Sequence, residues 1–300
     1  MAYWVEREGY SFLALSYPIE TRDNLIPDVD PNFGVRDWGK LIADIAGQYI
    51  REHGLSRSFI LSGWSMAGKV VRSAQVAARE RGLSIALFVS LAATPPVPEL
   101  AWGDWSRLKP GHGGIPDQSD LFPEWCVALD EAERLNGRRP VDDARFLSEY
   151  VGMTPLNIVG YPLRHKNGSF EIDQAEAIED SQPFDFANYP LVAVMQPDFA
   201  TDSTHAMADT FMWGFFTTQK IILDWLRGVD FPALPPLAWT RLRALVRTAP
   251  ARLTFPVHGG HGFFIGQRGA QQAVAAYSRL RLEADALKAE LGAVVGRTIN

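Results

Sequence analysis

Apolar residues along this chain occur in short continuous runs that are separated by longer stretches with helical spacing. Short apolar runs bounded by turn residues are typical of buried β-strands. The run at 85–92 (IALFVSLA) is apolar almost throughout, as expected for a strand covered on both faces of a parallel sheet. This pattern predicts five strands, at 10–17, 58–63, 85–92, 191–195 and 253–257.

Between these runs, apolar side chains recur every three to four residues. In the stretch 35–53, for example, Trp38, Leu41, Ile42 and Ile45 fall on one helical face, and Gly54 is a suitable helix end. Strands that alternate with helices favour an α/β protein with a doubly wound, mostly parallel sheet. The predicted helices cover 35–53, 67–81, 206–227, 237–248 and the chain from 268 onward.

The alternation is interrupted between residues 95 and 188, where Pro, Gly, Trp and charged residues mix with short helical pieces. We interpret 95–188 as a cap or lid inserted into a core formed by 1–94 and 189–300. Aromatic side chains of such a cap line an apolar acyl pocket or form the cap's own small core. The residues concerned are Trp102, Trp105, Phe122, Trp125 and Tyr150.

Composition places the chain among soluble globular proteins and makes several functions improbable. The 300 residues are 47% hydrophobic and 21% charged, with a net charge of −6, which does not favour a nucleic-acid partner. The single cysteine, Cys126, excludes an intrachain disulfide and fits a reducing compartment. No signal peptide or membrane-spanning run is evident, so we expect a cytoplasmic protein with no membrane partner.

One motif carries chemistry, the segment Gly63-Trp64-Ser65-Met66-Ala67 between a predicted strand and a predicted helix. This context is the one required of the G-x-S-x-G nucleophile elbow, with Ala67 in the place of the second glycine. The tight turn presents the serine hydroxyl at a helix N-terminus. There the Met66 amide and the helix dipole stabilise an oxyanion. The motif predicts Ser65 as a catalytic nucleophile.

Together with its surroundings, this motif resembles the α/β-hydrolase superfamily, and more narrowly the thioesterase domains of polyketide and peptide synthetases. The resemblance covers SFILSGWSMAGKVV and AARERGLSIALFVSLAATPP, and it resumes at HGGHGFF. It implies that the catalytic histidine lies after the last strand, where His261 is preferred over His258. It also implies an acid after the strand 191–195, where Asp198 is preferred and Asp202 is the alternative.

Two features depart from the family pattern. Synthetase thioesterases often carry the acid after the preceding strand, but that position falls near Ala92 here, which weakens the thioesterase resemblance. The central strand whose loop normally supplies a second oxyanion donor is also missing. Three explanations remain open: an upstream start of the natural protein, direct pairing of 10–17 with 58–63, or a strand from a partner chain. The backbone near 16–19 is one candidate donor.

The expected function is therefore hydrolysis of an ester or thioester with an apolar acyl group, through Ser65, His261 and Asp198 and an acyl-enzyme. The alternative is a weak or inactive hydrolase-fold protein that binds a ligand or partner through its cap. No metal or cofactor is expected, since no zinc spacing or phosphate loop is present. A heptad-like stripe in the C-terminal helix, from Ala273 to Val294, suggests a homodimer contact.

Overall fold

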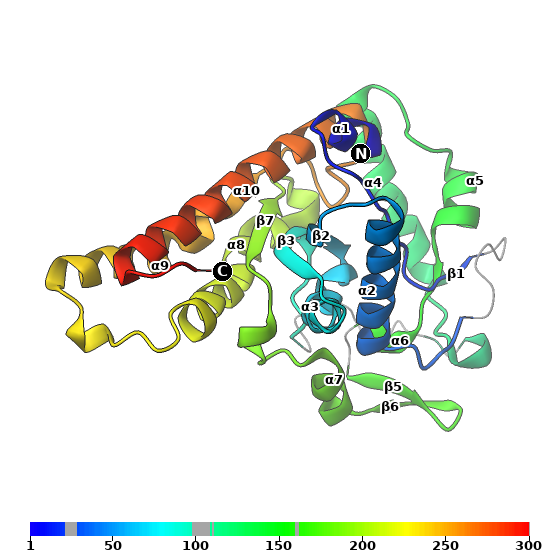
Figure 1. The fold of residues 1–300 in the computed structure, drawn as a ribbon. Helices are drawn as coiled ribbons and strands as arrows, with labels where there is room; N and C mark the ends of the chain where they lie inside the picture. The colour runs from blue at the N-terminus through cyan, green and yellow to red at the C-terminus, as the bar shows by residue number, and fades with distance from the viewer. Residues whose placement is uncertain (22–28, 98–108, 110, 160–161, 300) are drawn as a thin grey trace.

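The computed structural model describes residues 1–21, 29–97, 109, 111–159 and 162–299, and within them the protein is a mixed α/β structure (Figure 1). Its central sheet contains four parallel strands in the order β2-β3-β7-β8. Each lies within two residues of a strand predicted from the sequence. The strands are β2 Ser58–Ser65, β3 Ser84–Ala93, β7 Val192–Gln196 and β8 Thr254–Pro256.

Helices cover both faces of this sheet. On one face, Leu87, Val89 and Leu91 of β3 pack in a core cluster with α9 Pro236–Arg252 and α10 Gly266–Val295. On the opposite face, Ile85 and Phe88 of β3 and Val192 of β7 pack against a further set of helices. Those helices are α2 Val35–Glu52, the short 3₁₀ turn η1 Met66–Val70, α3 Val71–Glu80 and α8 Ser203–Lys220.

The prediction of a strand at 10–17 is wrong. After the short helix α1 Ala2–Arg7 this segment is an irregular coil, and Leu13 and Leu15 remain about two-fifths exposed. Its direct pairing with 58–63 is therefore excluded. An apolar run says nothing about whether a partner strand is within reach, and here no sheet contact forms. The chain first enters a sheet at β1 Glu20–Thr21, which pairs with β4 Gly152–Met153 instead of the central sheet.

The segment between β3 and β7 wraps around the helical layers (Figure 1). The helix α4 Phe122–Asn136 lies along the start of α10, whereas α7 Gln174–Ser181 packs on the start of α2. There the Asp180 carboxylate accepts hydrogen bonds from the backbone N–H groups of Val35 and Arg36. The remaining elements are α5 Asp143–Arg145, α6 Leu156–Val159 and the hairpin β5 Leu163–Lys166 and β6 Ser169–Ile172.

Short helical turns of 3₁₀ or π type complete the described elements. Two of them adjoin the helix that follows β7: η7 lies directly before α8, and η8 continues it. They are η3 His112–Gly114, η4 Ser119–Leu121, η5 Phe146–Tyr150, η6 Phe186–Asn188, η7 Ala200–Asp202, η8 Ile221–Trp225 and η9 Phe231–Ala233.

The apolar stripe of α10 is buried inside the protein. Leu280, Leu287 and Leu291 are at most 1% exposed and share one core cluster with Leu242 and Leu245 of α9. In Figure 1, α9 runs beside the distal half of α10, away from the sheet. The stripe is therefore covered within the chain and is not the free dimer surface that the sequence suggested. Within the described part of the chain, no helix is long and apolar enough to cross a membrane.

Candidate active site

Ser65 stands at the sharp turn where β2 ends and η1 begins. Its backbone angles are φ 54° and ψ −124°, a conformation that residues other than glycine rarely adopt. Such a conformation costs on the order of 1–3 kcal/mol and persists only where the surrounding structure fixes it. Met66 follows as the first residue of η1, so its N–H is among the first-turn groups that lack an acceptor within the helix.

The small residues around Ser65 are required by close backbone contacts. A Cβ added to Gly63 would lie 2.9 Å from the Phe88 ring, and one added to Gly68 would lie 2.2 Å from the Thr94 carbonyl oxygen. Thr94 in turn donates its N–H to the Ser65 carbonyl at 3.0 Å. The motif predicted small residues at this turn, and the structure gives the reason for them.

A β-bulge in the neighbouring strand supports the turn. The pairing of β2 with β3 shifts after Trp64, so that Ser65 lies opposite Ala93 and Ala92 is left out of register with φ 47°. The Ser90 hydroxyl accepts the Ala93 N–H at 3.1 Å, and the buried Trp213 indole donates to the Ala93 carbonyl at 2.7 Å. Bulges of this kind re-aim side chains and are frequent beside active sites.

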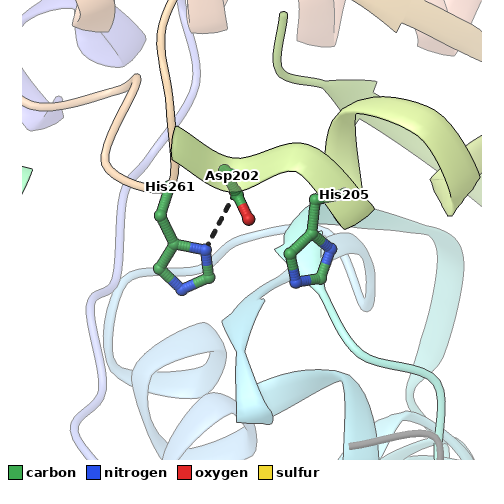
Figure 2. Close-up of side chains that lie close together, drawn as sticks. All are labelled: Asp202, His205 and His261. Carbon is green, nitrogen blue, oxygen red and sulfur yellow. Dashed lines mark hydrogen bonds and ion pairs between the residues drawn. The ribbon is translucent and has the colours of Figure 1, made fainter. Parts of the chain in front are cut away.

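His261 lies on the loop between β8 and α10, and its partner is Asp202. The imidazole Nδ1 is 3.1 Å from the Asp202 Oδ2 atom (Figure 2). The Asp202 side chain is 11% exposed, whereas that of His261 is 34% exposed. Asp202 reaches this position at the end of η7, which follows β7 after a short loop and leads directly into α8. The pair thus combines a sheltered carboxylate with an accessible imidazole.

Asp198, the acid preferred from the sequence, is placed elsewhere. Its Oδ2 atom is 3.0 Å from His258 Nδ1, and its Oδ1 atom accepts the Gly259 N–H at 2.9 Å. Partial burial raises the pKa of Asp198, but these hydrogen bonds outweigh burial and hold the pKa below its ordinary value. Both side chains of this pair are more than half exposed. Asp198 therefore pairs with His258 and fastens the start of the histidine loop, while Asp202 faces His261.

Trp64 connects the elbow to the histidine loop. Its indole N–H donates to the His261 carbonyl oxygen at 2.8 Å, and the two rings are 5.4 Å apart. Within the described residues the Ser65 hydroxyl itself makes no hydrogen bond, and catalytic hydrogen bonds are often long before substrate binds. The residue next to Ser65 thus holds the loop that carries His261.

The inserted helix α4 braces the same loop from the other side. A Cβ on Gly260 would lie 2.2 Å from the Glu131 carboxylate, and one on Gly259 would lie 3.3 Å from Leu135. Asn136, at the end of α4, donates from its side-chain amide to the Ile265 carbonyl at 3.2 Å. The glycines of this loop therefore allow α4 to pack directly against it, and α4 contributes to positioning His261.

A second histidine, not predicted from the sequence, lies beside this pair. His205 lies one turn after Asp202 on α8, and its ring centroid is 5.4 Å from that of His261 (Figure 2). Its Nδ1 is 2.8 Å from the fully buried Asp209. Burial lowers the pKa of His205, but the hydrogen bond to Asp209 and its charge outweigh burial and raise the pKa above its ordinary value. The signal was the spacing 202, 205 and 209, which places all three on one helical face.

The predicted apolar pocket residues are only partly described. Trp102 and Trp105 lie outside the described residues, whereas Phe122 and Trp125 contact each other with ring centroids 5.2 Å apart. Tyr150 is 58% exposed, so it is not part of a buried core. The apolar stretch of α8 divides between its two faces. Trp213 and Phe216 are buried, whereas Met207, Phe211 and Phe215 are exposed.

Ser65, Asp202 and His261 follow the carboxyl ends of β2, β7 and β8, respectively. Because these strands are parallel, their carboxyl ends meet at one edge of the sheet, which is the usual location of sites in open α/β proteins. Tyr17, in the candidate oxyanion-donor segment 16–19, packs on the same apolar cluster around Trp38 as Met66. No protein-family model, curated protein or solved structure matches this chain.

Proposed function

We propose that this protein is a serine hydrolase of the α/β-hydrolase type, in which Ser65 is the nucleophile, His261 the general base and Asp202 the acid. The observation that carries the proposal is the strained backbone of Ser65 at the carboxyl end of β2. Backbone strain at a serine between a strand and a helix is typical of a turn that presents a nucleophile, and this role explains why the strained conformation is kept. The Asp202–His261 pair at the same sheet edge supports it.

The chemistry follows from the roles that these groups allow. Asp202 accepts the Nδ1 proton of His261, which leaves Nε2 free to take the Ser65 proton as the Oγ atom attacks the acyl carbon. The tetrahedral oxyanion accepts a hydrogen bond from the Met66 N–H at the start of η1. His261 then returns the proton to the leaving alcohol or thiol. Water repeats the sequence on the acyl-enzyme and releases the carboxylic acid.

The proposed substrate is an ester or thioester of an apolar acid. The aromatic residues Phe122 and Trp125 on α4 lie on the helix that braces the His261 loop, which supports an apolar acyl group. The triad chemistry is the same for oxygen and sulfur leaving groups, so both substrate types belong in one screen.

The two Asp–His pairs provide a matched test of this assignment. With p-nitrophenyl esters and acyl thioesters as substrates, we expect Ser65→Ala to abolish turnover. Asp202→Asn lowers kcat by about 10⁴-fold, as in other triads where the imidazole loses its correct tautomer. His258→Gln is the control, because it removes the exposed histidine of the neighbouring pair, and it retains most of the activity. Equal losses in Asp202→Asn and His258→Gln would contradict the assignment of the acid.

The alternative function, a hydrolase-fold protein that binds a ligand or partner without turnover, predicts a different result. In that case no ester or thioester is hydrolysed by folded wild-type protein, and Ser65→Ala has no effect on ligand binding. The strained conformation of Ser65 favours the enzyme over this alternative.

A further inference from the structure

Asp202, His205 and His261 form a compact group of metal-binding side chains. Each of the three offers one oxygen or nitrogen atom, and these atoms all lie within 4.8 Å of one another. Figure 2 shows the Asp202 carboxylate between the two imidazole rings, with Asp202 at the end of η7, His205 on α8 and His261 on the facing loop. Ligands of a tetrahedral zinc ion are about 3.3–3.5 Å apart, given bonds of about 2.0–2.2 Å. Small side-chain rotations therefore bring all three atoms onto one ion.

A second observation points to a metal ligand at His205. Metal-binding histidines usually donate their other ring N–H to a carboxylate, which fixes the tautomer and orients the ring. Asp209 takes this role for His205, with Nδ1 and Oδ1 2.8 Å apart and the carboxylate 0% exposed. The second Asp209 oxygen, Oδ2, is buried without a hydrogen-bond partner among the described residues. A metal ion bound by His205 would place a positive charge near this buried carboxylate, and buried charges are stabilised when they are paired or coordinate metals.

We propose that Asp202, His205 and His261 bind Zn²⁺ through two imidazole nitrogens and one carboxylate, with water completing the coordination. This ligand set suits zinc, because imidazole and carboxylate are the donors that zinc accepts alongside thiolate. The complete site was not predicted from the sequence, because Asp202 and His261 are separated by 59 residues. Only the fold brings the α8 residues and the histidine loop together.

Zinc at this position is a reversible inhibitor of the hydrolase, a consequence that rests on the proposed function. A neutral imidazole has one ring nitrogen with a free lone pair, so His261 cannot bind zinc through it and also accept the Ser65 proton. Coordination also removes the Asp202 carboxylate from its role as partner of Nδ1–H. Metal binding and triad chemistry therefore exclude each other at the same two residues.

Direct binding of Zn²⁺ to the purified, EDTA-treated chain tests the site without reference to catalysis. In isothermal titration calorimetry we expect one high-affinity ion per chain for the wild type, for Ser65→Ala and for His258→Gln. Asp209→Asn weakens binding by about 10–100-fold, the usual effect of losing an outer carboxylate, and His205→Gln weakens it further. Because His205 is buried, His261→Gln on the exposed loop is a second ligand deletion, with circular dichroism to verify folding.

The activity measurement uses the same proteins. Zn²⁺ inhibits ester hydrolysis by the wild type with half-inhibition near the measured Kd, and EDTA restores the rate. His205→Gln, which leaves the serine triad intact, hydrolyses the ester and resists Zn²⁺. Unchanged zinc affinity in both His205→Gln and His261→Gln would overturn the proposed site, whether or not the chain is a hydrolase. Turnover that rises with Zn²⁺ and survives Ser65→Ala would overturn both the inhibition and the serine mechanism.

Discussion

Replacing Ser65 with glycine separates the two properties of this position, its strained backbone and its hydroxyl group. Both Ser65→Gly and Ser65→Ala remove the proposed nucleophile, so we expect both variants to be inactive. Only glycine relieves the strain, because it adopts φ 54° without a Cβ in conflict with the neighbouring backbone. We therefore expect Ser65→Gly to be the more stable of the two inactive proteins.

The size of the difference follows from two opposing contributions. Strain of the kind seen at Ser65 is on the order of 1–3 kcal/mol. Glycine opposes this gain by about 0.5–1 kcal/mol, because it has more conformational freedom to lose on folding than alanine. The net expectation is that Ser65→Gly is more stable than Ser65→Ala by about 1 kcal/mol.

Urea unfolding measures this difference, provided that the two variants have equal m-values. Ser84 provides the matched control, since it is an exposed strand residue that lacks a positive φ. At that position glycine is expected to be less stable than alanine by about 0.5–1 kcal/mol. If Ser65→Gly were also less stable than Ser65→Ala, the turn would not be strained and the main support for the proposed function would be lost.

Two further predictions concern the residues that follow Ser65. Gly68→Ala would place its Cβ 2.2 Å from the Thr94 carbonyl oxygen, so we expect it to lower the free energy of unfolding by about 1–3 kcal/mol. Gly47→Ala on α2 is the control, because its Cβ has room, and we expect it to raise the free energy of unfolding by about 0.5–1 kcal/mol. Equal effects of the two substitutions would contradict the packing around Gly68. Burial lowers the pKa of Lys69 from 10.5 to about 7, so between these values the unfolded chain binds an extra proton and stability rises with pH. The free energy of unfolding of the wild type, relative to Lys69→Met, should increase by about 1.4 kcal/mol per pH unit over this range, and a pH-independent difference would refute the depressed pKa.

The parts of the fold that were predictable from sequence are those with a local physical cause. The buried runs of β3 and β7 read as strands because both of their faces need apolar side chains. The motif was recognisable because Gly63 and Ala67 flank Ser65 between a predicted strand and a predicted helix, and the contacts at Gly63 and Gly68 explain why this turn needs small residues. The run at 10–17 has a similar composition but no partner strand, and composition alone does not reveal that.

The site residues show a similar limit. Asp198 and Asp202 are on the same loop, and the choice between them depends on where α8 begins and which way it turns. The helix was expected from residue 206, which left Asp202 and His205 in a loop and hid their common face with Asp209. The structure starts α8 at Ser203 and brings this face against the His261 loop. Long-range packing of α4 and Trp64 fixes that loop, and neither contact has a local sequence signal.

The most direct test of the central claim is covalent labelling with a fluorophosphonate, followed by mass spectrometry of the modified peptide. An activated serine attacks the phosphorus, releases fluoride and carries the phosphonate as a stable adduct. We expect one adduct, on Ser65. It should be absent in Ser65→Ala, and it should form much more slowly in His261→Gln. Folded wild-type protein that is not labelled at Ser65, or is labelled equally fast in His261→Gln, would contradict the claim that Ser65 is a nucleophile activated by His261.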